Sequence, residues 1–112
     1  MALLCFDVDG TLDTGDGPIP VSVLHDLEGS GHTVVIVSPS PLRPRDAGFP
    51  EFLSVDRKKN LLDALEAHPS DRPVYISDND GDDALSAEVD FEYVHPLFWQ
   101  GFHSRLEADG AM

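Results

Sequence analysis

The stretch Cys5–Gly15, CFDVDGTLDTG, places three aspartates within seven positions directly after the apolar run Leu3–Phe6. Carboxylates gathered in this way repel one another and are costly to remove from water. An unpaired cluster behind a buried strand therefore indicates cation binding or chemistry rather than core stability. Gly10 follows the second aspartate and permits a tight turn. We interpret Leu3–Phe6 as a buried strand that delivers Asp7 and Asp9 to a functional edge.

The rest of the chain alternates short apolar runs with helical spacing. Five short runs rich in β-branched or aromatic residues are expected strands: Leu3–Phe6, Thr33–Val37, Glu51–Val55, Val74–Ile76 and Phe91–Val94. Helical patterns cover Val21–Leu27, Leu61–Leu65 and Ala84–Val89, and a closing helix is expected over Leu97–Ala108. This alternation predicts a three-layer, Rossmann-like α/β fold of about five parallel strands with helices on both faces. We expect one domain over residues 1–112, with Cys5, Phe98 and Trp99 in its core.

The connection between the second and third strands is expected to be irregular. It contains four prolines, Pro39, Pro41, Pro44 and Pro50, where a crossover helix would otherwise fit. Proline lacks an amide donor and opposes helical geometry in the residue before it.

The chain is strongly acidic, with 21 acidic against 7 basic residues and a net charge of −14. Such a surface repels a nucleic-acid backbone, so nucleic acid is not an expected partner. Disorder is disfavoured because 41% of the residues are hydrophobic and fall in periodic blocks. The Asp-rich, Lys-poor composition resembles that of proteins from salt-loving organisms, in which concentrated salt screens the repulsion.

We expect a cytoplasmic protein without a membrane segment. The longest apolar runs, such as Ala2–Phe6 and Val34–Val37, are far shorter than the roughly 20 residues of a spanning helix. A signal peptide would carry basic residues ahead of its apolar run, and none precedes Ala2–Phe6. The lone Cys5 cannot form an internal disulfide, which agrees with a reducing compartment.

Polar side chains follow several of the expected strands, at the edge where ligands bind in open parallel sheets. These residues are Asp7 and Asp9 after the first strand, Ser38 after the second, and Asp78 and Asp82 after the fourth, with Asp83 as the alternative to Asp82. Strand alternation would place Asp7 and Asp9 on the same side. Oxygen ligands without histidine or cysteine suit Mg²⁺.

Groups that could bind phosphate lie near the same edge. Thr11 and the amides beyond Gly10 are candidates in the first turn. The only lysines, Lys58 and Lys59, fall at the start of a helix that begins near Arg57 and that Asp56 is expected to cap. We favour Lys58 because it shares a helical stripe with three leucines, and Lys59 stays open as the alternative.

The order and spacing of these residues resemble the four motifs of the haloacid dehalogenase superfamily of phosphotransferases. The matching stretches are DVDGT, VVIVS, the lysine of DRKKNLLDAL, and VYISDNDGD, which together span about residues 3 to 95. The resemblance implies a Mg²⁺-dependent phosphomonoesterase. Its substrate would be a phosphorylated small molecule or an accessible phosphate on a larger one. The segments between the motifs are consumed by the crossovers, so it implies a form without a cap domain.

The resemblance also implies a role for each motif residue. Asp7 would attack the phosphoryl group to form an aspartyl-phosphate, and Asp9 would act as general acid and base. Thr11, Ser38 and Lys58 would bind the phosphoryl oxygens. Mg²⁺ would bind Asp7, Asp78 and the backbone carbonyl of Asp9, with Asp82 completing or orienting its shell.

Two other functions are compatible with an acidic pocket on such a sheet. A response-regulator receiver domain would carry its phosphoryl group after the third strand, here on Asp56. It is disfavoured because Asp9 stands two residues from Asp7 and the lysines precede a mid-chain helix. A catalytically silent binding protein on the same fold is disfavoured because every motif residue is present.

Overall fold

The protein folds around one five-stranded, all-parallel sheet with the strand order β3, β2, β1, β4, β5. The computed structural model describes residues 2–39 and 48–110. The strands are β1 (Leu3–Phe6), β2 (Thr33–Val37), β3 (Glu51–Phe52), β4 (Pro73–Ile76) and β5 (Glu92–Val94). The prediction of about five parallel strands is confirmed.

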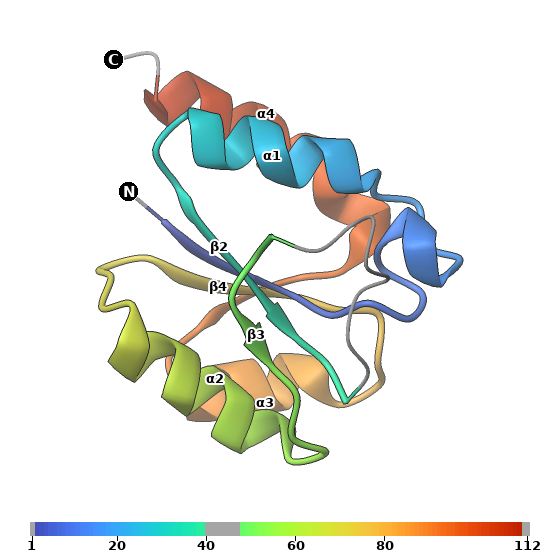
Figure 1. The fold of residues 1–112 in the computed structure, drawn as a ribbon, viewed down its shortest axis with the longest axis vertical. Helices are drawn as coiled ribbons and strands as arrows, with labels where there is room; N and C mark the ends of the chain where they lie inside the picture. The colour runs from blue at the N-terminus through green and yellow to red at the C-terminus, as the bar shows by residue number, and fades with distance from the viewer. Residues whose placement is uncertain (1, 40–47, 111–112) are drawn as a thin grey trace.

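Helices cover both faces of this sheet and complete a three-layer, Rossmann-like α/β fold (Figure 1). The helices are α1 (Val21–Gly29), α2 (Arg57–Ala67), α3 (Asp82–Glu88) and α4 (Trp99–Gly110), with short 3₁₀ turns η1 (Asp13–Gly15) and η3 (Pro96–Phe98). Helices α1 and α4 lie on one face, and α2 and α3 lie on the other. Among the described residues, no helix is both long and apolar enough to cross a lipid bilayer.

The central strand β1 supplies both halves of the hydrophobic core. Leu4 and Phe6 belong to the cluster on the α1 and α4 face, whereas Leu3 and Cys5 belong to the cluster on the α2 side. This division follows from the two-residue period of a strand, and all four side chains are fully buried. Cys5 is thus a core residue, as predicted, and its burial strongly raises the pKa of its thiol.

The register of the sheet brings three strand ends to one level. Phe6 is aligned with Ile36 of β2 and with Ile76 of β4. The amide of Asp7 continues the pairing by donating to the carbonyl of Ile76 at 3.0 Å. The residues that follow β1, β2 and β4 therefore lie at the same edge of the sheet.

The structure differs from the sequence-based prediction at the closing helix. The chain first makes the 3₁₀ turn η3, in which the His95 side chain accepts a hydrogen bond from the Leu97 amide at 3.1 Å, and α4 begins only at Trp99. Trp99 is buried against Phe6, with the rings edge to face and their centroids 5.4 Å apart. Phe98, which was predicted to be core, is 73% exposed. The prediction failed because a 3₁₀ turn distributes side chains with a different period from an α-helix.

Two other elements are shorter or oriented differently than expected. Strand β3 ends at Phe52 rather than Val55, because the Ser54 amide donates to the side chain of Asn60 instead of to a strand. Helix α3 buries Asp82 and Ser86, while Ala84 is exposed. The expected irregular connection falls mostly on residues 40–47, which lie outside the described residues.

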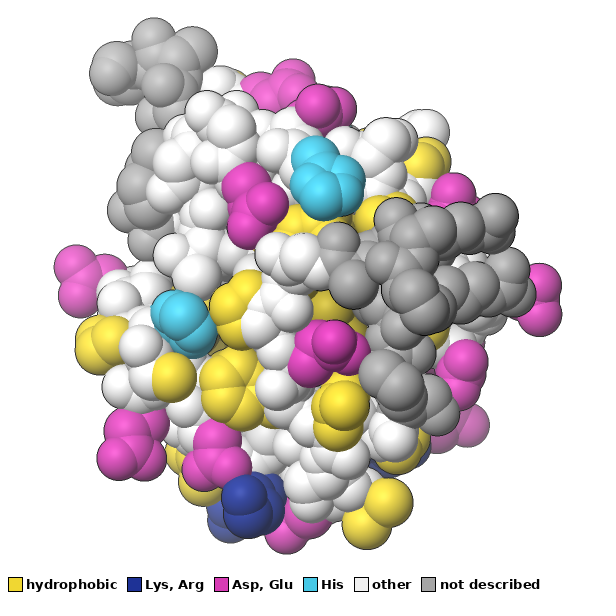
Figure 2. Space-filling view, viewed as in Figure 1, with side chains coloured by type: hydrophobic (Ala, Val, Ile, Leu, Met, Phe, Trp, Pro, Cys, Tyr) yellow, Lys and Arg dark blue, Asp and Glu magenta, His cyan; other side chains and the backbone are white. Residues whose placement is uncertain are grey.

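On the face that Figure 2 shows, acidic side chains are scattered rather than gathered in one patch. On the face that Figure 2 shows, basic side chains are few and cluster near one edge.

The buried Phe6 and the exposed Phe98 allow a matched test of this packing. We expect Phe6→Ala to lower the free energy of unfolding by about 3–5 kcal/mol, since it empties a fully buried site against Trp99. Phe98→Ala should change it by less than about 0.5 kcal/mol because that ring is exposed. Urea unfolding followed by fluorescence measures both, and equal losses would contradict the packing described.

Candidate active site

The segment after β1 forms a tightly hydrogen-bonded loop at the carboxyl edge of the sheet. The amides of Thr11 and Leu12 both donate to the carbonyl of Val8, at 3.1 and 3.0 Å, and the amide of Ile19 donates to the carbonyl of Thr11 at 3.1 Å. Leu12 and Ile19 are buried in the core. The loop is thus anchored at both ends, which fixes the residues of the first motif before α1 begins.

Asp7 is the buried carboxylate of this edge. Only 6% of the residue is exposed, and its Oδ2 accepts a hydrogen bond from Asn79 Nδ2 at 2.9 Å. The pKa of Asp7 is raised to about 6, mainly by burial and additionally by the nearby carboxylates of Asp78 and Asp82. The backbone amide of Val8 and the Asn79 amide oppose this rise without cancelling it.

Asp78 meets the first loop directly. Gly10 has a φ of +72°, and a Cβ atom at this position would lie 1.9 Å from Asp78 Oδ2. Any side chain at position 10 would therefore displace the carboxylate. The structure brings together the loops that follow β1 and β4, as the sequence predicted.

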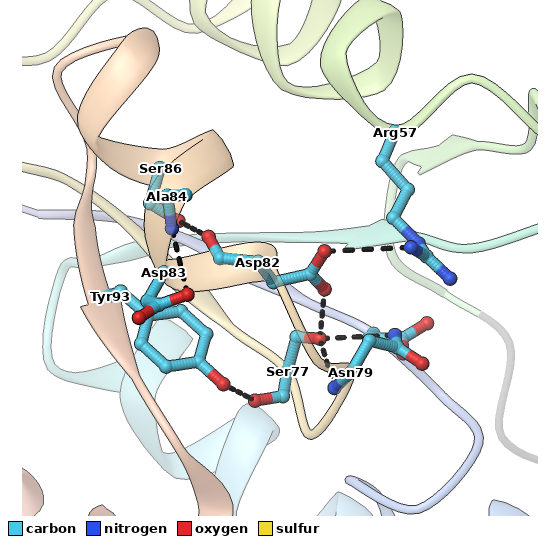
Figure 3. A network of polar contacts seen from close by, with 9 residues as sticks. Arg57, Ser77, Asn79, Asp82, Asp83, Ala84, Ser86 and Tyr93 are labelled. Carbon is cyan, nitrogen blue, oxygen red and sulfur yellow. Dashed lines mark hydrogen bonds and ion pairs between the residues drawn. The ribbon is translucent and has the colours of Figure 1, made fainter.

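A polar network around Ser77 holds the loop after β4 (Figure 3). Ser77 Oγ donates to Asp82 Oδ2 at 2.5 Å and accepts from the Asn79 backbone amide at 3.2 Å and from Asn79 Nδ2 at 3.1 Å. These three bonds use the full capacity of a hydroxyl group. The Tyr93 hydroxyl also donates to the Ser77 carbonyl at 2.6 Å, which ties the loop to β5. Asn79 is thereby oriented toward Asp7.

Asp82 is held by partners on two elements. It is 2% exposed, and its Oδ1 lies 3.6 Å from Nη1 of Arg57, the first residue of α2. Its second oxygen accepts the bond from Ser77. Because both oxygens have protein partners, the arrangement suits a positioning role better than direct metal coordination. Asp83, the alternative, is exposed and its Oδ1 accepts from the Ala84 amide at 2.8 Å.

Within the described part of the chain, Arg57 rather than either lysine is the cation that reaches this network. Lys58 Nζ pairs with Glu88 Oε1 at 2.6 Å, and Lys59 Nζ pairs with Asp63 Oδ2 at 2.6 Å. Both pairs are exposed, and in neither does the lysine contact Asp7 or Asp82. The structure thus does not bring the predicted Lys58 to the site.

The buried face of α2 explains this outcome. Its buried residues are Asn60, Leu61 and Ala64, which follow Arg57 at offsets of three, four and seven. Of the three leucines on which the choice of Lys58 depended, Leu61 is buried, whereas Leu62 is 44% exposed. The residue that could have revealed the buried face of α2 is Asn60. Its side chain is buried because it accepts a hydrogen bond from the Ser54 amide at 3.0 Å and donates to the Ser54 carbonyl at 2.7 Å.

The remaining predicted residues lie at the same edge in different environments. Asp9 is exposed, and since β1 ends at Phe6, strand alternation does not govern its side chain. Ser38 is buried, and its amide donates to the Phe52 carbonyl at 3.1 Å. Thr11 is fully buried, and its Oγ1 has no hydrogen-bond partner in the part of the chain that the structure describes.

The residues fit a magnesium ion with an open coordination shell, not an all-protein cage. Within residues 2–39 and 48–110, no three His, Cys, Asp or Glu groups are placed to enclose a metal ion. Asp7 and Asp78 remain as two carboxylates at one edge. Mg²⁺ typically takes one or two carboxylates and completes its shell with water and substrate phosphate. The buried, unpartnered Thr11 hydroxyl beside this edge is consistent with a ligand that brings polar atoms.

Comparison of the chain with protein-family models, with curated proteins and with solved structures found no match. Inferences about activity therefore depend on the chemistry of these residues.

The raised pKa of Asp7 predicts a specific effect on stability. Because the pKa is near 3.8 in the unfolded chain and about 6 in the native protein, the native state binds the proton more tightly. Stability is therefore lost as the pH rises through about 6. Without divalent cations, Asp7→Asn should raise the free energy of unfolding at pH 7 by about 1–2 kcal/mol, since two pKa units set an upper limit of about 2.7 kcal/mol.

Urea unfolding between pH 4 and pH 7 measures this difference, and the exposed Asp71→Asn serves as the control. The advantage of Asp7→Asn over the wild type should grow with pH in this range. A variant less stable than the wild type at pH 7 would contradict the described environment of Asp7.

Proposed function

We propose that the protein is a Mg²⁺-dependent phosphomonoesterase that acts through an aspartyl-phosphate. The observation that carries this proposal is the carboxylate of Asp7, which is buried at the end of the central strand with two other carboxylates nearby. None of the salt bridges among the described residues involves Asp7. Burying an unpaired carboxylate lowers the stability of the fold. A carboxylate in this position is suited to bind a cation and to attack an electrophilic phosphorus.

In the first step, an Asp7 oxygen attacks phosphorus and the bond from phosphorus to the ester oxygen breaks. Asp9, which is exposed in the adjoining turn, gives a proton to the leaving alcohol. In the second step, Asp9 removes a proton from a water molecule that attacks the same phosphorus. Inorganic phosphate leaves, and the Asp7 carboxylate is restored.

The neighbouring residues would orient Asp7 and bind the phosphoryl oxygens. Asn79 holds one oxygen of Asp7, which leaves the other to act as the nucleophile. Thr11 and Ser38 are candidates to donate to the phosphoryl oxygens. Arg57 takes the place that the sequence suggested for Lys58, because it is the cation in contact with the Ser77–Asp82 network. An arginine can donate two parallel bonds to phosphate oxygens.

Asp7 and Asp78 would hold Mg²⁺, with the backbone carbonyl of Asp9 as a further ligand. When bound, the ion would offset the charge between these carboxylates and the phosphoryl oxygens. Asp82 would hold Arg57 and Ser77 in position.

A receiver domain is the less supported alternative. Its phosphoryl acceptor would be Asp56, whose side chain already accepts a bond from the Lys59 amide at 3.2 Å and caps α2. This capping role supports a structural assignment for Asp56.

Replacing Asp7 and replacing Asp9 should have different effects, because Asp7 is the proposed nucleophile and Asp9 the proposed general acid and base. Asp7→Asn should reduce phosphate release from p-nitrophenyl phosphate to background, since the nucleophile is gone. Asp9→Asn should lower kcat by about 10²–10⁴-fold while Mg²⁺ binding stays largely intact, because only proton transfer is lost. A colorimetric phosphate assay and calorimetric Mg²⁺ titration measure these effects, and EDTA should abolish wild-type turnover. Full activity of either variant would contradict the roles assigned here.

A second test compares adjacent cations of α2. Arg57→Ala should lower kcat/KM by about 10–10³-fold because it removes charge at the phosphoryl oxygens. Lys58→Ala should change kcat/KM by less than about twofold, since it removes only an exposed ion pair with Glu88. Arg57→Lys should recover part of the loss. If Lys58→Ala lowered kcat/KM more than Arg57→Ala, the phosphate-binding role would belong to Lys58 instead of Arg57.

A further inference from the structure

A pocket of about 340 Å³ opens beside the proposed phosphoryl site. It is lined by Asp78, Asn79, Asp80, Gly81, Asp83, Tyr93, His95, Leu97 and Phe98. Asp78 and Asn79 belong to both places, since Asn79 bonds Asp7 and Asp78 lies against Gly10. A phosphate ester bound at Asp7 can therefore extend its leaving group into this pocket.

The pocket is rich in negative charge. Three of its side chains are the carboxylates of Asp78, Asp80 and Asp83, against one histidine, His95, and no lysine or arginine among the described residues lines it. If Asp78 serves a metal ion, Asp80 and Asp83 still face the pocket, and no salt bridge in the described part of the chain involves either of them. A leaving group with a second phosphate or a carboxylate would be repelled here, while a cationic one would be attracted.

The same pocket presents aromatic and aliphatic surface. Leu97 and Phe98 line it and are 79% and 73% exposed, which is unusual for such large apolar side chains. The Tyr93 ring is fixed because its hydroxyl donates to the Ser77 carbonyl at 2.6 Å. Aromatic faces attract organic cations, and an ammonium group with alkyl substituents matches both the rings and the carboxylates.

We infer that the substrates are phosphate monoesters of amino alcohols, with the alkylammonium end of the leaving group seated among Asp80, Asp83, Tyr93 and Phe98. This inference rests on the proposed phosphatase activity and adds the class of leaving group. The amino-alcohol chain would run from Asp7 past Asn79 into the pocket.

The test compares two esters of the same shape, choline phosphate and its uncharged carbon isostere 3,3-dimethylbutyl phosphate. We expect kcat/KM to be at least about tenfold higher for choline phosphate at low ionic strength and the ratio to shrink as KCl is added. Asp80→Asn/Asp83→Asn should bring the ratio close to one. Asparagine keeps the acceptor that bonds the Ala84 amide, so the loop should be preserved.

A matched control removes the same charge elsewhere. Glu66→Gln/Asp71→Asn changes two exposed carboxylates outside the pocket and should leave the ratio at its wild-type value. A wild-type ratio near one, or a ratio that both double variants change equally, would overturn the inference while leaving the phosphatase proposal in place.

Binding to Asp7→Asn separates the two proposals. Calorimetric titration of this variant should show tighter binding of choline phosphate than of 3,3-dimethylbutyl phosphate, again by about tenfold. If the wild type releases phosphate from neither ester nor from p-nitrophenyl phosphate, the phosphatase proposal fails. Equal binding of the two esters by Asp7→Asn overturns the assignment of the leaving group.

Discussion

The burial of one carboxylate at the end of the central strand is the constraint around which this edge of the molecule is arranged. Strand β1 is paired on both sides and packed on both faces, so its end cannot move toward solvent. Asp7 is tied to β4 through the Ile76 carbonyl at 3.0 Å. The negative charge of Asp7 is thus fixed where water screens it poorly, which opposes folding unless a bound ligand offsets it.

The surrounding groups orient this charge but do not neutralise it. Asn79 contributes a neutral donor, and Arg57, the cation that the described residues bring to this network, pairs with Asp82. Ser77 links these groups, and every bond its hydroxyl can form is made. The network therefore holds the loop after β4 rigidly against α2 and β5. A site organised in this way before ligand binding loses little free energy to rearrangement when a ligand arrives.

The fold could be predicted from the sequence because its signals are local and redundant. Leu3–Phe6 and Thr33–Val37 are apolar on both faces, and the residues after them mark the edge of the sheet. The position of Asp7 and Asp78 followed from that topology, and the contact between Asp78 and Gly10 agrees with it. The contact of Arg57 with Asp82 could not be predicted, because the stripe of leucines pointed to Lys58, while the buried stripe of α2 contains the polar Asn60.

Asn79 and Phe98 show two further limits of the sequence. Asn79 stands between Asp78 and Asp80 in the loop after β4, and only the three-dimensional path of the loop reveals that it donates to Asp7. Phe98 has the composition of a core residue, and its exposure depends on the 3₁₀ turn that His95 and Pro96 start.

The central claim, that Asp7 carries the phosphoryl group, is tested most directly by trapping the intermediate. Acid-quenched protein taken during turnover is reduced with borohydride, which converts an aspartyl-phosphate to homoserine, and the peptides are read by mass spectrometry. The account predicts homoserine at position 7 only when substrate and Mg²⁺ are both present. Homoserine at Asp56, or phosphate release without any modified aspartate, would contradict it.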